Sequence, residues 1–344
     1  MRAVVRWLAR RAVLSLLPVL GLLALPAVAA ETLKIATISP EGSSWMRIMR
    51  EGAAQVARDT QNRVAIRFYT GGAMGDDKAV LRKIRAGQLQ GAAITTGSLT
   101  QLYGDVQLYN LPMLFRNYAE VDVVRRRVDP LIEAGIETKG FEVLGFAEAG
   151  FAYAMSRLPA SSVQAARRQR MWIPDADPGA QIAVKAFGID SVPLTIIDVL
   201  PMLQSGNIDA VAMPPVGVVA LQWHSYLKHV LDIPLVYVYG TIVLDQRAFA
   251  KLSAADQATV RRVMGAAMAR INETNRRDND AARQALQRQG LRFITPNPQE
   301  YAGWKAAADK AVRDTVAAGT VSRPMYDVLV RTLEQVRAPR PAAR

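Results

Sequence analysis

Between residues 32 and 96 the chain alternates short strand patterns with amphipathic helix patterns, and this alternation limits the possible folds more than any other feature. Predicted helices begin where Ser43 or Ser44 and, later, Asp76 can cap them, and Gly87 lies just past the end of the second helix. Strands that alternate with helices of about ten to fifteen residues pair in parallel through right-handed crossovers. The sequence therefore predicts an α/β fold with strands at 32–37, 63–69 and 91–96.

A similar unit returns in the second half of the chain. Thr195 and Asp198 have the spacing of a capping box, with aspartate in place of the usual Glu or Gln, and they open a predicted helix that carries Leu203. The stretch 205–213 then echoes 86–94, because in each a glycine ends a helix and a small-residue strand follows a polar turn. Either the two halves share a structural plan, or this is a chance similarity between two helix-to-strand turns.

One long helix is predicted from Ser253 to about Arg288, followed by Gly290. Its apolar periodicity breaks at the polar stretch 272–280, so we expect the helix to leave one core before it reaches another. At 1.5 Å per residue it is about 50 Å long, more than the diameter of one domain. Two α/β lobes joined by such a spine predict a clamshell that closes on a small molecule at the carboxyl ends of its strands.

The first thirty residues predict export. Arginines precede an apolar run at 12–25, and the small residues 26–30 give a cleavage site, so 1–30 is read as a secretory signal peptide and the mature chain as periplasmic. An uncleaved membrane anchor is the alternative, disfavoured because the run is short for a bilayer span. Removing the four arginines of this segment, which has no acidic residue, lowers the formal net charge from +13 to +9. An exported chain without a recognisable binding motif argues against nucleic acid.

Metal and cofactor chemistry have little support in the composition. The chain has no cysteine, and its two histidines, His224 and His229, are five residues apart rather than at the four-residue spacing of helical zinc sites. We therefore expect neither a metal nor a cofactor.

Five stretches carry a family resemblance over residues 33 to about 330: "LKIATISPEGSSW" (33–45), "GGAMGDDKAVLRKIRAGQLQGAAITTGSL" (71–99), "LYNLPMLFRNY" (108–118), "VPLTIIDVLPMLQSGNIDA" (192–210) and "KLSAADQATV" (251–260). In order and spacing they resemble the periplasmic solute-binding proteins of tripartite ATP-independent periplasmic (TRAP) transporters, the DctP type. The resemblance implies a two-lobed, type II-like periplasmic binding protein fold with a long helix spanning both lobes. It also implies delivery of a small organic solute to membrane permease subunits. We expect residues 31–152 plus about 240–275 in lobe I, and 153–239 plus about 276–344 in lobe II.

Three positions depart from the family pattern. Members typically place a carboxylate-binding arginine two residues before the equivalent of Pro174, and this chain has Trp172 there. The basic residue usual after "GF" is Ala152, and the usual asparagine before Pro214 is Met213. Indole offers one neutral donor and a large apolar face in place of a bidentate guanidinium. The resemblance therefore implies a solute that contains a carboxylate or is more apolar or aromatic than usual, without the usual carboxylate clamp.

The candidate substrate-binding residues follow from the family alignment and from the strand ends. They are Trp172, Met213, Phe151, Trp45, Thr96, Ser98, Tyr153, Asp175 and Trp223. Each has a structural alternative: a core indole for Trp172, a gap-filling side chain for Met213, an ordinary turn for Thr96 and Ser98, a turn acid for Asp175, and core packing for Trp223. If Trp172 forms a cleft wall, alanine there is expected to abolish stabilisation by ligand and to leave the unliganded protein nearly unchanged.

An enzyme is disfavoured, because the chain lacks the sequence motifs of a nucleophile elbow, a zinc protease or a P-loop, and we assign no catalytic residue. A periplasmic ligand sensor that signals to a membrane receptor kinase is the main alternative, since the same clamshell serves both. Residues 326–335 are amphipathic, and some relatives dimerise through a C-terminal helix, so both a monomer and a homodimer remain open.

Overall fold

Strands and helices alternate along the first hundred residues as the sequence predicts. A computed structural model describes residues 30–175 and 177–338, so the predicted signal peptide lies outside the described residues except for Ala30. Its first units are β1 (Glu31–Thr37), α1 (Ser44–Asp59), β2 (Val64–Tyr69), α2 (Asp77–Arg85) and β3 (Gly91–Thr95). Ser43 and Asp76 cap the two helices with side-chain oxygens, and β1 pairs in parallel with β2 and β3. The predicted parallel α/β unit is confirmed.

The second α/β unit repeats the helix-to-strand turn of the first. It contains α4 (Val163–Ala166), β5 (Arg170–Pro174), α5 (Pro178–Phe187), β6 (Asp190–Leu194), α6 (Val199–Ser205) and β7 (Ala210–Met213). Gly87 and Gly206 both have positive φ just beyond α2 and α6, at 72° and 71°. The predicted capping box is wrong, because the Thr195 hydroxyl donates to the Asp198 carboxylate and the helix starts later, at Val199.

Two long antiparallel strands join the lobes. β4 (Phe141–Ser156) pairs with β9 (Val236–Asp245) along residues 141–152 and then with β7 along 153–156. The strand order β2-β1-β3-β9-β4-β7-β5-β6 therefore runs through both lobes, with β8 (His229–Leu231) paired to β4 and β10 (Arg292–Ile294) paired to β8. β4 bends at two register shifts where Gly145 and Gly150 have φ of 113° and 112°, a region that disfavours other residues. This gives the two-lobed α/β fold expected from the sequence.

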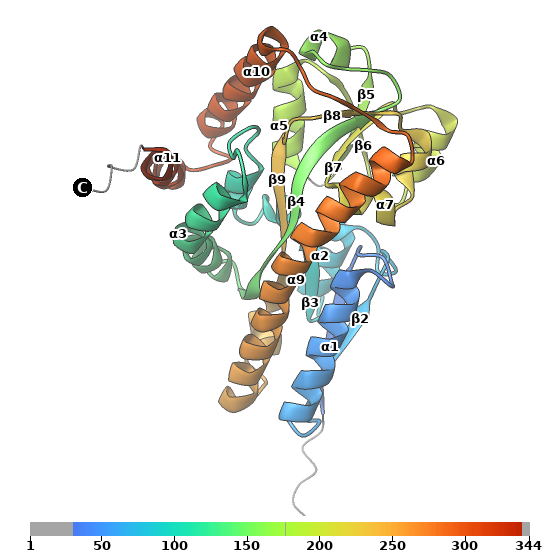
Figure 1. Cartoon of the computed structure of the whole chain (residues 1–344). Coiled ribbons are helices and arrows are strands. Elements are labelled where there is room, and N and C mark those ends of the chain that lie inside the picture. The colour runs from blue at the N-terminus through green and yellow to red at the C-terminus, as the bar shows by residue number, and fades with distance from the viewer. Residues whose placement is uncertain (1–29, 176, 339–344) are drawn as a thin grey trace, which may run out of the picture.

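The long predicted helix is confirmed as α9 (Ala254–Arg288), which runs diagonally along both lobes in Figure 1. Its first half, through Ile271, packs in one hydrophobic cluster with α1, and Leu286 packs in the core of lobe II. Between them, the amides of Asn275 and Asn279 are buried and donate to the carbonyls of Glu148 and Ala149 on β4. The polar stretch thus holds the helix to β4 where it crosses between cores.

The remaining helices cover the two lobes. They are α3 (Tyr118–Glu137), α7 (Pro215–Ala220), α8 (Gln246–Phe249), α10 (Pro298–Ala317) and α11 (Arg323–Arg337), together with 3₁₀-helices at Thr96–Leu99, Gly104–Asn110 and Trp223–Tyr226. α10 packs against α5, whereas α11 lies beside α3 (Figure 1) and places Leu329 and Leu333 in the lobe I core. The predicted division assigned α11 to lobe II, but its apolar face packs on lobe I. None of the helices within the described ranges has the length and apolar composition of a membrane span.

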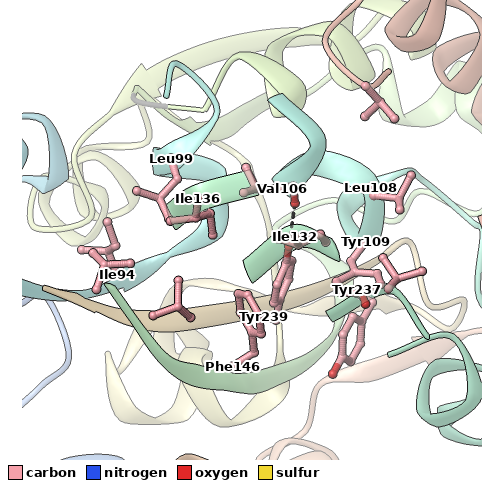
Figure 2. Packing of buried hydrophobic residues seen from close by; sticks show 14 of the residues in the cluster. Ile94, Leu99, Val106, Leu108, Tyr109, Ile132, Ile136, Phe146, Tyr237 and Tyr239 are labelled. Atoms are coloured by element: carbon pink, nitrogen blue, oxygen red, sulfur yellow. Dashed lines mark hydrogen bonds between the residues drawn. The ribbon is translucent and has the colours of Figure 1, made fainter. Parts of the chain in front are cut away.

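The core of lobe I contains a cluster of aromatic side chains. Tyr109, Tyr237, Tyr239 and Phe146 lie together beneath the sheet, and Figure 2 shows the Tyr239 hydroxyl bonded to the Val106 carbonyl. Tyr109 and Tyr239 meet edge to face with ring centroids 4.7 Å apart. This cluster packs against β4 and against the first residues of β9, from which Tyr237 and Tyr239 come.

Candidate functional site

A cavity of about 220 Å³ lies between the two lobes. Lobe I contributes the end of β3 and the start of α2, and lobe II contributes β5, α5 and the end of β7. A second cavity of about 170 Å³ shares Thr95, Met213, Val238 and Tyr239 with the first. Both cavities lie at the carboxyl ends of parallel strands, which is where ligands bind in open α/β sheets. The cavities together are the candidate ligand site.

The lobes touch each other across the larger cavity. The Lys78 ammonium on α2 donates to the Asp175 carbonyl at 2.8 Å and lies 3.4 Å from its carboxylate, after β5. The Gln107 amide of lobe I donates to the Asp177 carboxylate at 2.5 Å. A Cβ added to Gly97 would lie 2.3 Å from an Asp177 carboxylate oxygen, so glycine permits this approach. These contacts between the lobes show that the structure has the closed arrangement of the two lobes.

Five of the nine predicted site residues line these cavities. Trp172, Met213, Ser98 and Asp175 border the larger one, and Trp45 and Met213 border the smaller one. The Trp45 indole N–H donates to the Asn275 side-chain oxygen, which fixes its ring beside the spine helix. The Asp175 carboxylate pairs with Lys78, and the Ser98 hydroxyl donates to Asp77. Their role toward a solute stays a prediction.

The other four predicted residues lie outside the lining of both cavities. Phe151 is buried in lobe I, where its ring packs against Tyr118 and Tyr237. The Thr96 hydroxyl is buried and donates to the Tyr239 carbonyl at 3.2 Å. Tyr153 lies under the Arg283 guanidinium, 5.5 Å from the ring centroid. Trp223 is buried in the lobe II core. These side chains turn to the core faces of their strands and helices, away from the cleft.

Trp172 borders the cavity but belongs mainly to the lobe II core. Along β5, Met171 and Ile173 face the cluster that includes α5 and α10, so Trp172 faces the opposite cluster. Only 5% of Trp172 is exposed, and its indole N–H donates to the Leu194 carbonyl at 3.0 Å. Its ring meets Trp223 edge to face at 5.2 Å. This burial is at odds with the expectation that alanine at 172 leaves the unliganded protein nearly unchanged.

Asp77 and Asn110 are cavity residues that the sequence reading missed. Asp77 is the first residue of α2, is 6% exposed, and accepts from the Ser98 hydroxyl at 2.5 Å through Oδ2. Its Oδ1 is buried without a hydrogen-bond partner among the described residues, and so is Oδ1 of Asn110. The sequence feature that indicates Asp77 is the pair of aspartates at 76–77. One carboxylate can cap the helix, so the second must have another environment.

The carboxyl group of Asp77 makes folding stability depend on pH. Burial raises the pKa of Asp77 from 3.8 to about 6, while the Ser98 hydrogen bond opposes part of that rise. The folded protein therefore binds this proton more tightly than the unfolded chain, so the ionised group destabilises the fold above about pH 6 and ceases to do so below about pH 4.

We expect Asp77→Asn to raise the free energy of unfolding by about 2–3 kcal/mol at pH 7.5 and to leave it almost unchanged at pH 4. The neutral amide keeps an acceptor for Ser98 and removes the buried charge. Urea unfolding at both pH values measures the difference, with Asp190→Asn, an exposed carboxylate at the start of β6, as the control. An equal effect at the two pH values would contradict the assignment.

The larger cavity has an acidic and apolar lining. Its charged residues are Asp76, Asp77, Asp175 and Asp177, and none of its described lining residues is Arg, Lys or His. Within the described residues, no cluster of three or more His, Cys, Asp or Glu side chains has the arrangement of a metal site. What the lining can do chemically is to accept hydrogen bonds and enclose an apolar body.

Sequence comparison identifies relatives over most of the chain. The family model of the bacterial extracellular solute-binding proteins, family 7 (DctP), matches residues 35–318. A solute-binding protein of Verminephrobacter eiseniae is 24% identical over 232 residues, which cover 67% of this chain and 69% of that protein.

Solved structures of low sequence identity share the fold. A TRAP periplasmic solute-binding protein from Ralstonia eutropha with bound (S)-2-acetolactate superposes with a TM-score of 0.83 at 18% identity, covering 89% of this chain and 99% of that one. The Bordetella pertussis receptor DctP7, which binds pyroglutamic acid, gives 0.82 at 17% identity and covers 89% and 100%. A Desulfovibrio salexigens TRAP protein with bound orotic acid gives 0.82 at 13%, covering 89% and 99%.

Proposed function

Because this chain belongs to family 7 of the bacterial extracellular solute-binding proteins, we propose that it is the solute-binding subunit of a TRAP-type transporter. It captures a small organic solute between its lobes and delivers it to membrane permease subunits, acting in the periplasm after removal of the signal peptide, as a monomer or homodimer. The family match over residues 35–318 carries this proposal. The proteins of that fold named above bind small organic acids, and the family is one of binding proteins, so no enzymatic role is assigned.

Closure of the lobes is the step that the geometry supports. β4, β9 and α9 pass between the lobes and provide a continuous hinge, in which β4 bends at Gly145 and Gly150. Lys78 with Asp175, and Gln107 with Asp177, join the lobes at the cavity. Closure therefore excludes water from a bound solute and presents one continuous surface for docking to a permease.

Blocking this closure is expected to abolish transport without unfolding the protein. In cells that lack the chain, the wild type should restore uptake of those solutes that raise the melting temperature of the purified protein, and Gly97→Ala should not. The added methyl group would lie 2.3 Å from the Asp177 carboxylate in the closed form. Gly303→Ala is the matched control, because nothing lies within 4 Å of a Cβ at that helix position. Uptake that is unchanged in cells without the chain, over a panel of organic acids and amines, would contradict the proposed function.

A further inference from the structure

The described residues that line the cavity between the lobes include no positive charge to neutralise an anion. Its four charged lining residues are aspartates, and the described lining contains no Arg, Lys or His. The ammonium of Lys78 is outside this lining and is bound to Asp175. A carboxylate that entered would lose its hydration shell beside like charges, which is unfavourable unless a cation or several donors replace the water.

Helix N-termini at the cavity are already capped. α2 and α5 both begin there, and free N–H groups at such ends could hold an anion. However, the Asp76 carboxylate accepts from Ala79 N at 2.7 Å, and the Asp177 carboxylate accepts from Ala180 N at 3.1 Å. The chain's own carboxylates therefore occupy the places where a ligand carboxylate would bind.

The hydroxyl and indole donors of the described lining are also engaged within the protein. The Trp172 indole donates to Leu194, and the Tyr239 hydroxyl donates to Val106 (Figure 2). The others have these partners: Trp304 with the Ser161 carbonyl, Thr195 with Asp198, Ser98 with Asp77, and Thr95 with Ser98. A solute that needs a hydroxyl or indole donor from this lining would have to break one of these bonds.

Two acceptors, in contrast, have no partner in the part of the chain that the structure describes. Oδ1 of Asp77 and Oδ1 of Asn110 are both buried and unbonded in residues that line the cavity, and Asp77 as a whole is 94% buried, since 6% is exposed. A buried acceptor without a donor costs the full desolvation of that group. A ligand donor that reached one of these oxygens would remove this cost, most of all a positively charged donor beside the Asp77 carboxylate.

The rest of the wall is apolar. Ile173, Val184, Phe187, Leu194 and Val238 line the cavity together with the edge of Trp172. The two cavities of the site, about 220 Å³ and about 170 Å³, together lie near the lower end of the range for small-molecule pockets, so the occupant is small.

We infer that the solute is a small organic amine, with an ammonium or amino group donating to Asp77 or Asn110 and an apolar body against β5 and α5, and that simple carboxylates are excluded. This rests on the proposed function, because it names the solute class of the same site. It also sets this chain apart from the structurally similar proteins with bound organic acids.

The test uses compounds that share one carbon skeleton. Benzylamine, benzyl alcohol and benzoate, followed by cyclohexylamine and cyclohexanecarboxylate, are titrated into the purified mature protein by calorimetry, with succinate and pyroglutamate as acids. Each amine is expected to bind at least tenfold more tightly than its matched carboxylate. Asp77→Asn should weaken amine binding at least tenfold and leave the weaker alcohol binding within a factor of two or three, whereas Asp190→Asn should change neither.

Tighter binding of the carboxylates would overturn the inference and leave the proposed function intact, and so would amine binding that Asp77→Asn does not alter. Binding of no compound in either series would also overturn it. The uptake comparison with Gly97→Ala then decides separately whether the chain is a transport subunit. The melting temperature of unliganded Asp77→Asn shows that the variant is folded.

Discussion

Replacing Trp172 with alanine is expected to lower the free energy of unfolding of the unliganded protein by about 3–5 kcal/mol, the usual cost of removing a buried aromatic side chain. The ring is 5% exposed and contacts Trp223 edge to face at 5.2 Å. Alanine would leave a cavity beneath β5 and would also leave the Leu194 carbonyl without its indole donor. The lobe II core loses both packing and a hydrogen bond.

Urea unfolding without ligand measures this loss. Trp172→Phe keeps an aromatic ring but removes the N–H and part of the packed volume. Its loss of stability should therefore be smaller than that of Trp172→Ala, and about 1 kcal/mol of it is expected from the unmet Leu194 carbonyl. Ile197→Ala is the control at the same cavity, where the side chain is 62% exposed and a change within about 0.5 kcal/mol is expected. A Trp172→Ala variant that kept wild-type stability and lost only ligand binding would show instead that the indole acts as a cleft wall.

The elements that the sequence predicted well are those with local determinants. Ser43, Asp76 and Ser253 cap helices where expected, because an N-cap is decided by a few neighbouring residues. The course of α9 across two cores followed from the break in its apolar periodicity. Local patterns of this kind carry most of the α/β architecture.

Features that depend on distant partners could not be predicted in this way. The capping box at Thr195 failed although its spacing was right, since the hydroxyl donates to Asp198 instead of accepting a backbone N–H. Asn275 and Asn279 lie in a stretch that reads as solvated, yet both are buried by bonds to β4. The amphipathic pattern of α11 does not indicate which element it packs against, and in the structure it packs on α3.

The candidate site was predictable to the level of the strand ends and no further. Trp172, Met213, Ser98 and Asp175 do reach the larger cavity, because the carboxyl ends of parallel strands meet there. Phe151 was expected near such an end, but the pleat of β4 turns it into the lobe I core. Trp223 packs in the lobe II core, which was its structural alternative. Asp77 could not be predicted as a site residue, because the burial that leaves its oxygen unpaired cannot be read from the sequence pattern.

Replacing Arg276 with methionine is expected to cost about 3–5 kcal/mol of folding stability, because it leaves a buried carboxylate without its cation. The Arg276 guanidinium on α9 binds the Glu148 carboxylate, whose side chain is 0% exposed, and Asp122 on α3. It also lies 4.5 Å from the centroid of the Tyr118 ring. Once the arginine is removed, Glu148 keeps the Tyr237 hydroxyl at 2.7 Å as a donor, but its charge is uncompensated at the point where α9 crosses β4.

A double variant distinguishes the unpaired charge from lost packing. Adding Glu148→Gln to Arg276→Met removes the charge itself, so most of the lost stability should return in urea unfolding, although neither single variant is stabilising. Asp122→Asn is the matched control on the other side of the guanidinium, where the carboxylate is 42% exposed and a loss below about 1 kcal/mol is expected. If the double variant were as unstable as the sum of the two single variants, the role of Arg276 would lie in packing on Tyr118, and the ion pair between the spine helix and the hinge strand would contribute little.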